Sequence, residues 1–311
     1  MIKLFQILKM GVQMSRYFFP FLLFSFIFLN NGCQERQTQS LYKPVGKSFE
    51  RNIYKIGIHP YLNSQKMFDA YKPIFAYLRE NIPNSIFILE TSKDYAAYDE
   101  KLYRREFDFS LPNPYQTYSS LKYGYKVIAK MKPDTIFRGI FVAKKSSQLT
   151  DVKQLIGKDI SFPAPTALAA TMMPLYFLHQ HGLNIQKDIT QKFVGSQYSS
   201  IMNAYSGDSI AGATWPTSWE AWCKENPEMA KQMELVWQTE PLVNNGFVVR
   251  DDVDSHIANK VAELLVGLDS HVTGKQMLQN AGFEGFEVAN NKTYDVVEDF
   301  MNKFNTATGQ E

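Results

Sequence analysis

Residues 159–181 read DISFPAPTALAATMMPLYFLHQH, and this stretch decides the fold that the chain is expected to adopt. Residues 159–162 alternate polar and apolar side chains, which predicts a short strand. Pro163 and Pro165 cannot continue a sheet, and from Thr166 onward alanine, leucine and methionine favour a helix. The stretch therefore predicts a strand, a tight loop and a helix with Thr166 as its N-cap.

The start of this helix is a candidate anion site. The first backbone amides of a helix have no intrahelical acceptor, and the helix dipole places positive charge beside them. The small side chains in residues 167–170 would let a ligand approach those amides. The alternative is an ordinary turn between a strand and a helix that packs on a sheet and binds nothing.

Strands and helices alternate along the rest of the chain. Apolar patterns predict further strands at residues 54–59, 85–89, 107–111, 125–131, 137–143, 191–195, 210–214, 235–239 and 240–250. Helical spacing separates most of them, so the fold class is α/β, with mainly parallel sheets flanked by helices. In such sheets ligands bind at the carboxyl ends of the strands, which places residues 59–61 beside residues 113–116.

The predicted strands fall into two groups. A second alternating series begins at Asp159, and the chain returns to the first group near residue 240. This order predicts lobe 1 at residues 52–139 plus 240–311 and lobe 2 at residues 140–239.

The first 32 residues have the pattern of a secretory signal peptide. Basic residues without an acid precede an apolar run at 17–29, which is too short to span a bilayer comfortably. Gly32-Cys33 directly after this run resembles a bacterial lipobox. Cys33 is therefore expected to be lipidated and to anchor an exported, periplasmic protein to the membrane.

Other interpretations of this region stay open. Asn30 and Asn31 depart from the usual lipobox, so cleavage by an ordinary signal peptidase is the alternative, and Met10 and Met14 are alternative starts. Residues 33–51 are polar and aperiodic, which predicts a flexible tether.

The balance of charge argues against a nucleic-acid partner. The chain has 33 Lys and Arg residues against 31 Asp and Glu residues, so it is nearly neutral. Cys33 and Cys223 are its two cysteines, and once Cys33 is lipidated no disulfide framework can form. Cys223 is expected to be a small apolar residue on a helix, with a nucleophile as the alternative.

The motifs of common enzymes and metal sites are missing from the sequence. It has no nucleophile elbow, P-loop, metal-ligand spacing or paired carboxylates on the predicted loops. His179 and His181 lie at the end of a predicted helix, where imidazoles favour the negative end of the dipole. We therefore expect neither an enzyme nor a bound metal or cofactor.

Five segments resemble one family of transport proteins. They are residues 56–60, 108–114, 157–162 running to 174–178, 195–201 and 244–250. All five are similar to segments of the phosphate, phosphite and phosphonate-binding branch of ABC-importer solute-binding proteins. The resemblance covers nearly the whole chain after the tether. It implies a two-lobed, type II periplasmic-binding-protein fold with a cleft and two hinge crossings.

The chain departs from this family at the residues that bind ligand. The family's Ser-Thr-Ser run at the helix start is matched here by Ala167, Leu168 and Ala169, and its histidine in the Gly-Ser-His turn is matched by Gln197. Its acidic residue has no counterpart in residues 211–213. The resemblance therefore implies the fold more firmly than it implies the ligand.

Polar and aromatic residues at the predicted strand ends form the candidate binding site, since aromatic walls with a few amides suit a small polar ligand. They are His59, Tyr61, Asn113, Tyr115, Gln116, Thr166, Ala167, Leu168, Ala169, Ser196, Gln197, Trp215 and Asn244. For the aromatic residues the alternative is core packing, and for Asn113 and Gln197 it is a turn or cap hydrogen bond.

The resemblance implies a monomeric solute-binding lipoprotein of an ABC importer. It would bind a phosphonate, a phosphate-like oxyanion or a related polar solute in the cleft and deliver it to a permease. The alternative is a protein of the same fold that binds a non-phosphorus ligand and signals to a membrane sensor kinase.

Overall fold

The computed structural model describes residues 52–309. The expected signal peptide, the lipidation of Cys33 and the tether at 33–51 concern residues outside this range. Within residues 52–309, no helix is both long enough and apolar enough to cross a membrane.

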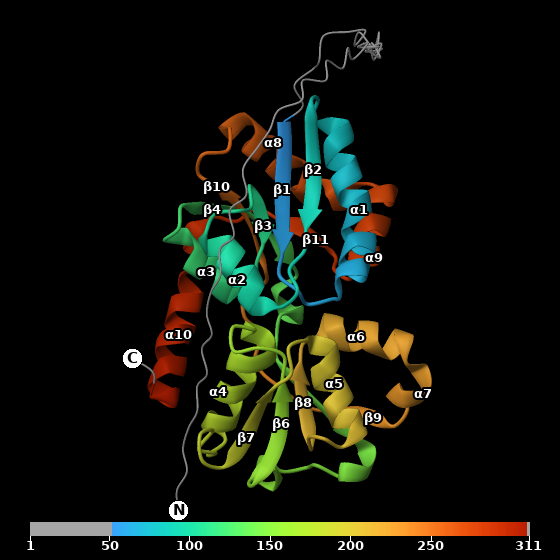
Figure 1. Ribbon diagram of the computed structural model, residues 1–311, viewed down its shortest axis with the longest axis vertical. Coiled ribbons are helices and arrows are strands. Elements are labelled where there is room, and N and C mark those ends of the chain that lie inside the picture. The colour runs from blue at the N-terminus through green and yellow to red at the C-terminus, as the bar shows by residue number, and fades with distance from the viewer. Residues whose placement is uncertain (1–51, 310–311) are drawn as a thin grey trace, which may run out of the picture. The chain divides into compact units, whose positions relative to one another are not determined.

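The first lobe is a six-stranded sheet with helices packed around it (Figure 1). The strand order is β11-β4-β10-β3-β1-β2. The strands are β1 Asn52–Ile58, β2 Ser85–Glu90, β3 Phe109–Leu111, β4 Tyr125–Lys132, β10 Gly246–Arg250 and β11 Gly285–Glu287. The helices are α1 Ser64–Asn81, α2 Tyr95–Tyr103, α3 Pro114–Leu121, α8 Ser255–Val266 and α9 Val272–Ala281, with short 3₁₀ turns at Asp134–Ile136, Leu268–Ser270 and Asn291–Tyr294.

The second lobe is a five-stranded sheet in the order β7-β6-β8-β5-β9. The strands are β5 Ile140–Lys144, β6 Lys158–Phe162, β7 Ile189–Phe193, β8 Ala211–Thr214 and β9 Met233–Gln238. The helices are the π-helix η4 Leu168–Met172, which continues into α4 Met173–Gln180, then α5 Gln197–Ser206, α6 Pro216–Glu225 and α7 Pro227–Ala230. Short 3₁₀ turns lie at Lys145–Ser147 and Val152–Leu155.

The α/β, two-sheet fold class is confirmed, but both sheets are mixed and not mainly parallel. In the first lobe β1 runs parallel to β2 and β3, whereas β10 is antiparallel to β3 and β4. In the second lobe β6 runs parallel to β7 and β8, whereas β5 is antiparallel to β8 and β9. The reason is that β5 and β10 are the strands by which the chain enters each sheet from the other lobe, so they run in the opposite direction.

The two crossings between the lobes are hydrogen-bonded to each other. The amide of Thr239 donates to the carbonyl of Gly139 at 2.9 Å, and the amide of Gly139 donates to Oγ1 of Thr239 at 3.0 Å. The amide of Leu242 donates to the carbonyl of Phe137 at 2.9 Å. Both chain segments therefore pass between the sheets as one paired ribbon.

Alanine at position 139 is expected to reduce the free energy of unfolding by about 1–3 kcal/mol, the usual cost of overpacking. Its Cβ would lie 2.4 Å from the carbonyl oxygen of Ala169 and 2.7 Å from Cδ of Pro174, so the backbone of η4 would have to move. Urea denaturation measures the change. Gly267→Ala is the matched control, because its nearest atom lies 3.3 Å away. Equal midpoints for the two variants would contradict the expectation.

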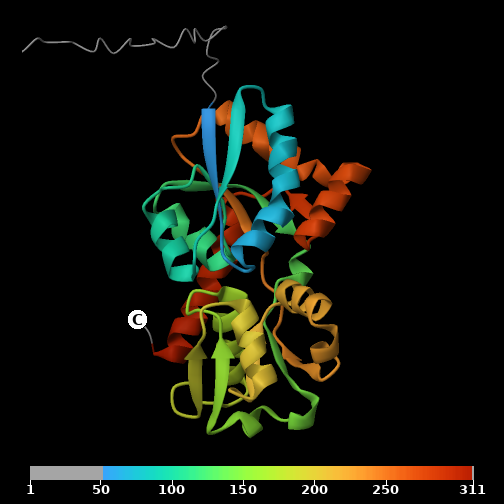
Figure 2. The same ribbon diagram turned by 45° about the vertical axis from the view of Figure 1, so that its right-hand side comes forward.

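The last helix, α10 Asp295–Thr308, contacts both lobes. It packs on α3 of the first lobe, and its Phe300 ring meets the ring of Tyr176 on α4 edge to face, with centroids 5.6 Å apart. The carbonyl of Thr308 accepts a hydrogen bond from Gln186 of the second lobe. In both views α10 lies beside the second lobe, although the strand before it belongs to the first (Figure 1, Figure 2).

Candidate functional site

A small cavity lies where the carboxyl ends of β1 and β8 meet the start of η4. Its volume is about 10 Å³, which is enough for about one water molecule. Its lining residues are His59, Tyr95, Asn113, Phe137, Ala167, Leu168, Ala169, Ala170, Gln197 and Trp215. Seven of them are residues that the sequence predicts for the site, namely His59, Asn113, Ala167, Leu168, Ala169, Gln197 and Trp215. We call this space the cleft cavity.

The residues at the start of η4 line one side of the cleft cavity. Within residues 52–309, the amides of Leu168, Ala169 and Ala170 have no hydrogen-bond acceptor, whereas the amide of Thr171 donates to the carbonyl of Ala167 at 2.7 Å. Free amides at a helix start attract negative charge. No lysine or arginine of the described chain lines the cavity, so these amides are its main donors to an anion.

The expectation that Thr166 caps this helix is wrong. The N-cap is Ala167, which has no side-chain cap, because the helix begins one residue later and as a π-helix. The Thr166 hydroxyl donates instead to Oδ2 of Asp99 on α2, at 2.9 Å. The Thr166 carbonyl accepts from Nδ2 of Asn113 at 2.9 Å. Thr166 therefore connects the two lobes beside the cleft cavity.

Asp99 is the acidic residue that accepts the hydrogen bond from Thr166. Nε2 of Gln116 donates to its Oδ1 at 2.6 Å, and Thr166 donates to its Oδ2. Burial raises the pKa of the Asp99 carboxyl to about 6, against the opposing effect of these two donors. A partly buried carboxyl with a raised pKa therefore accepts hydrogen bonds from Gln116 and Thr166 beside the cleft cavity.

His59 offers the cavity a hydrogen-bond acceptor and no positive charge. The ring is buried and Nδ1 lies 2.9 Å from the carbonyl oxygen of Leu111, so Nδ1 must carry the proton. Burial lowers the pKa of His59 to about 4, although the bond to Leu111 acts to raise it. At neutral pH Nε2 is therefore unprotonated and suits a protonated oxygen of a ligand.

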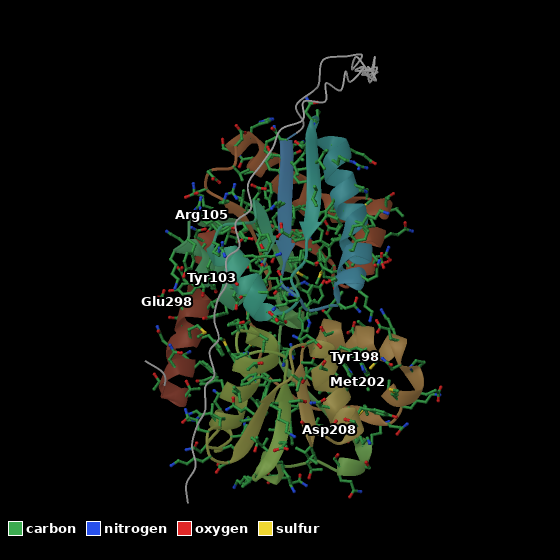
Figure 3. All side chains as sticks on the ribbon, viewed as in Figure 1. Tyr103, Arg105, Tyr198, Met202, Asp208 and Glu298 are labelled. Carbon is green, nitrogen blue, oxygen red and sulfur yellow. The ribbon has the colours of Figure 1, made fainter. Side chains whose placement is uncertain are left out.

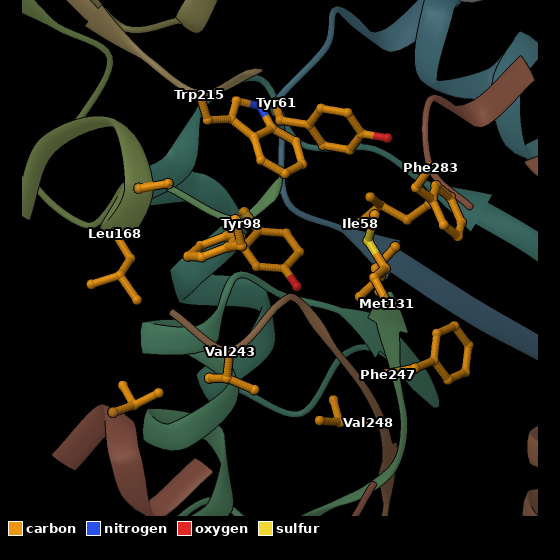
Figure 4. Packing of buried hydrophobic residues seen from close by; sticks show 14 of the residues in the cluster. Ile58, Tyr61, Tyr98, Met131, Leu168, Trp215, Val243, Phe247, Val248 and Phe283 are labelled. Atoms are coloured by element: carbon orange, nitrogen blue, oxygen red, sulfur yellow. The ribbon is translucent and has the colours of Figure 1, made fainter. Parts of the chain in front are cut away.

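Gln197 and Trp215 connect the second lobe to the first. Oε1 of Gln197 accepts from Oγ1 of Thr214 at 2.7 Å, and its Nε2 donates to the hydroxyl of Tyr95 at 3.1 Å. The Trp215 ring lies edge to face with Tyr61, with centroids 5.4 Å apart (Figure 4). Both residues thus touch the cavity and hold the lobes together around it.

The other predicted site residues do not line the cleft cavity. Tyr61 and Ser196 line a larger neighbouring cavity. Gln116 closes a capping box with Asn113 at the start of α3, and Tyr115 on the same helix is half-buried against the core. Asn244 lies at the second crossing, where its Nδ2 donates to the carbonyl of Pro133 at 2.9 Å.

Sequence reasoning missed Tyr95 and Phe137, and it included Ala170 only as part of the run at residues 167–170. Tyr95 begins α2 directly after β2, so the rule that ligands bind at strand ends could have found it. Ala170 continues the run of amides that starts at Leu168. No sequence pattern could have identified Phe137 as a site residue, because it lies on the crossing and not at the end of a strand.

Among residues 52–309, no three His, Cys, Asp or Glu side chains gather in a way that could hold a metal ion. Cys223 is a free, partly buried cysteine, and burial raises the pKa of its thiol. A raised thiol pKa disfavours the thiolate, which is the nucleophilic form.

Comparison with known proteins identifies the family. Residues 56–294 match the family of ABC transporter, phosphonate, periplasmic substrate-binding proteins. The chain therefore belongs to this family, as the five sequence segments indicate. Its members are solute-binding proteins, which confirms the prediction that the chain is not an enzyme.

Three comparisons with individual proteins agree with this assignment. The probable ABC transporter phosphite binding protein PhnD1 of Prochlorococcus marinus strain MIT 9301 is 28% identical over 192 residues, which span 58% of this chain and 65% of that protein. The structure of PhnD1 from that organism with methylphosphonate has a TM-score of 0.75 at 23% identity, covering 82% of this chain and 98% of the other. A binding protein component of an ABC phosphonate transporter from Pseudomonas aeruginosa has a TM-score of 0.76 at 12% identity, covering 84% and 89%. At these identities the two structures show a shared fold.

Proposed function

We propose that the chain binds a small phosphorus oxyanion, such as a phosphonate or phosphite, in the cleft cavity and delivers it to an ABC permease. The observation that carries this proposal is the row of unpaired amides at Leu168, Ala169 and Ala170, which line a cavity between two lobes. In this chain the backbone amides take the place of the hydroxyl groups in the family's Ser-Thr-Ser run. They can still donate to several oxygens of one anion.

The neutral His59 ring favours one protonation state of the ligand. A phosphonate monoanion has a P–OH group that can donate to Nε2 of His59, while its other oxygens accept from the amides of η4. A fully ionised ligand has no such proton to donate to Nε2 of His59. The cavity therefore suits the monoanion better than the dianion.

The hydrogen bonds between the lobes describe a closed state. Asn113 and Asp99 bind Thr166, Tyr95 binds Gln197, and the closed cavity has room for about one water molecule. Entry of a ligand therefore requires these bonds to break and the lobes to rotate about the paired crossings. Binding then favours a state in which both lobes contact the ligand but lie further apart than in this structure, whose cavity has room for about one water molecule.

A thermal-shift screen tests the proposed ligand. The full chain, kept in solution with mild detergent, is heated with methylphosphonate, phosphite, phosphate, sulfate or small neutral polar solutes. Ligand at 100 times Kd stabilises the folded state by about 2.7 kcal/mol, so Tm should rise by roughly 5–10 °C with a phosphorus oxyanion. A shift with a different solute and none with any phosphorus oxyanion would overturn the proposal.

One observation favours a second candidate function. Ala167, Leu168 and Ala169 stand where the family has its Ser-Thr-Ser run. A less strongly charged, non-phosphorus solute needs fewer donors, and a protein binding it could signal to a membrane sensor kinase. The same screen separates the two candidates by the chemistry of the solute that shifts Tm.

We further propose that the mature chain is a periplasmic lipoprotein anchored through Cys33. The parent chain should be found in membrane fractions, and a Cys33→Ala variant should not. An equal distribution of the two chains would contradict anchoring through Cys33.

A further inference from the structure

A second, larger cavity lies directly beside the cleft cavity. It has a volume of about 520 Å³, and Gln197 lines both spaces. Its walls come from both lobes: residues 60–64 after β1, residues 92–93 after β2, and residues 195–198 at the start of α5. We call it the outer cavity. A ligand held at η4 could extend into it past Gln197.

The charges on its walls favour an anion. Lys66, Lys93 and Glu225 are its charged lining residues within the described chain. Lys66 forms an ion pair with Glu225 across the lobes and lies over the ring of Tyr198, with Nζ 5.7 Å from the centroid. Lys93 is exposed and has no acidic partner within residues 52–309. The wall therefore has one uncompensated positive charge.

Two helices begin at this cavity and add to the positive potential. Ser64 is the first residue of α1, which has 18 residues, and Gln197 is the first residue of α5, which has 10. Neither helix has an acidic residue in its first turn. No acidic side chain therefore offsets either N-terminal dipole, although Asn63 and Ser196 each cap one amide.

Ser92 is a buried polar residue on the wall of the outer cavity. It lines the outer cavity and is 8% exposed, and its hydroxyl has no hydrogen-bond partner in the described chain. A buried hydroxyl without a partner costs free energy.

We propose that the outer cavity holds a second anionic group of an elongated phosphorus ligand. This inference rests on the proposed function, because the phosphorus group would occupy the amides of η4. The ligand class is a phosphonate that has a carboxylate or second phosphoryl group on a short arm. An ammonium group fits less well, because Glu225 is already paired with Lys66. Figure 3 shows Tyr198 on α5, which contributes to the wall that this arm would face.

Calorimetric titration of the full chain with two probes tests the inference. Methylphosphonate has the phosphorus group alone, whereas phosphonoacetate adds a carboxylate. We expect phosphonoacetate to bind about fivefold more tightly, since a partly exposed charge contact is worth about that factor. Lys93→Gln should remove most of this gain and leave the Kd for methylphosphonate within about twofold. Added salt should reduce the gain in the parent.

The control is Lys72→Gln, which removes an exposed lysine of α1 that does not line the outer cavity. It should keep the preference for phosphonoacetate. If methylphosphonate binds and phosphonoacetate binds no more tightly, or if Lys93→Gln weakens both probes equally, only the present inference is overturned. If neither probe binds and the thermal-shift screen shows no shift with phosphite or phosphate, the proposed function fails together with it.

Discussion

Replacing Trp215 with alanine is expected to lower the free energy of unfolding by about 3–5 kcal/mol, the range for large aromatic residues in a core. The side chain is 2% exposed and packs against Tyr61 and Phe137, with ring centroids 5.4 and 5.9 Å away. Its Nε1 donates to Oγ of Ser218 at 2.6 Å, and that hydroxyl lies 3.2 Å from the carbonyl oxygen of Tyr61. Truncation therefore removes both packing and a polar connection between the lobes.

The same change should also weaken ligand binding, because Trp215 lines the cleft cavity. Typical domains are stable by about 5–15 kcal/mol, so the variant should remain folded in buffer. Urea denaturation measures the stability and calorimetry with methylphosphonate measures the affinity. Trp219→Ala is the control, since this tryptophan of α6 is partly exposed and stacks on Trp222. A Trp215→Ala variant as stable as the parent would show that the ring is not part of the core.

Replacing Asp99 with asparagine is expected to stabilise the protein at neutral pH by about 2 kcal/mol. Burial raises the folded pKa from 3.8 to about 6, each pKa unit corresponds to about 1.4 kcal/mol, and the partial exposure of the carboxyl reduces the total. Asparagine can still bond to Thr166 and Gln116, because an amide both donates and accepts. The variant therefore loses the buried charge and keeps the network.

The pH dependence has a definite sign. Between about pH 4 and pH 6 the folded chain holds the Asp99 proton more tightly than the unfolded chain does. The contribution of Asp99 to stability is therefore complete below pH 4. It is lost as the pH rises through 6. The advantage of Asp99→Asn should grow across that window and then level off. Urea denaturation from pH 4 to pH 8 measures it.

Asp159→Asn provides a control of opposite sign. The hydrogen bond from Lys192 lowers the pKa of Asp159, so its contribution is present above the ordinary pKa and lost at lower pH. This variant should be less stable than the parent at neutral pH. If Asp99→Asn shows the same trend with pH as Asp159→Asn, the proposed burial of the Asp99 charge is wrong.

The sequence allowed the βα units to be predicted because apolar spacing is local. Strands β1, β2, β6 and β8 lie within two residues of their predicted bounds. Strand direction was not predictable in the same way. β5 and β10 pair antiparallel because of the path of the chain between lobes, which no pattern inside either strand encodes.

The candidate site shows the same division between local and distant effects. His59, Asn113, Gln197 and Trp215 follow strands, so the strand-end rule places them together. Thr166 fails as a cap because a π-helix start and a bond to Asp99 override its local preference. Asp99 itself lies in the middle of α2, where an acidic residue gives no sign that a threonine 67 positions away will meet it.

The contact of α10 with both lobes limits how the protein can open. A helix that packs on α3 and also on α4 acts as a fulcrum, because separating the lobes on its own side would expose the Phe300 and Tyr176 rings together. The ion pair of Lys66 with Glu225 joins α1 to α6 on the opposite side in both views (Figure 1, Figure 2). We expect that side to act as the gate, so that solute enters between α1 and α6.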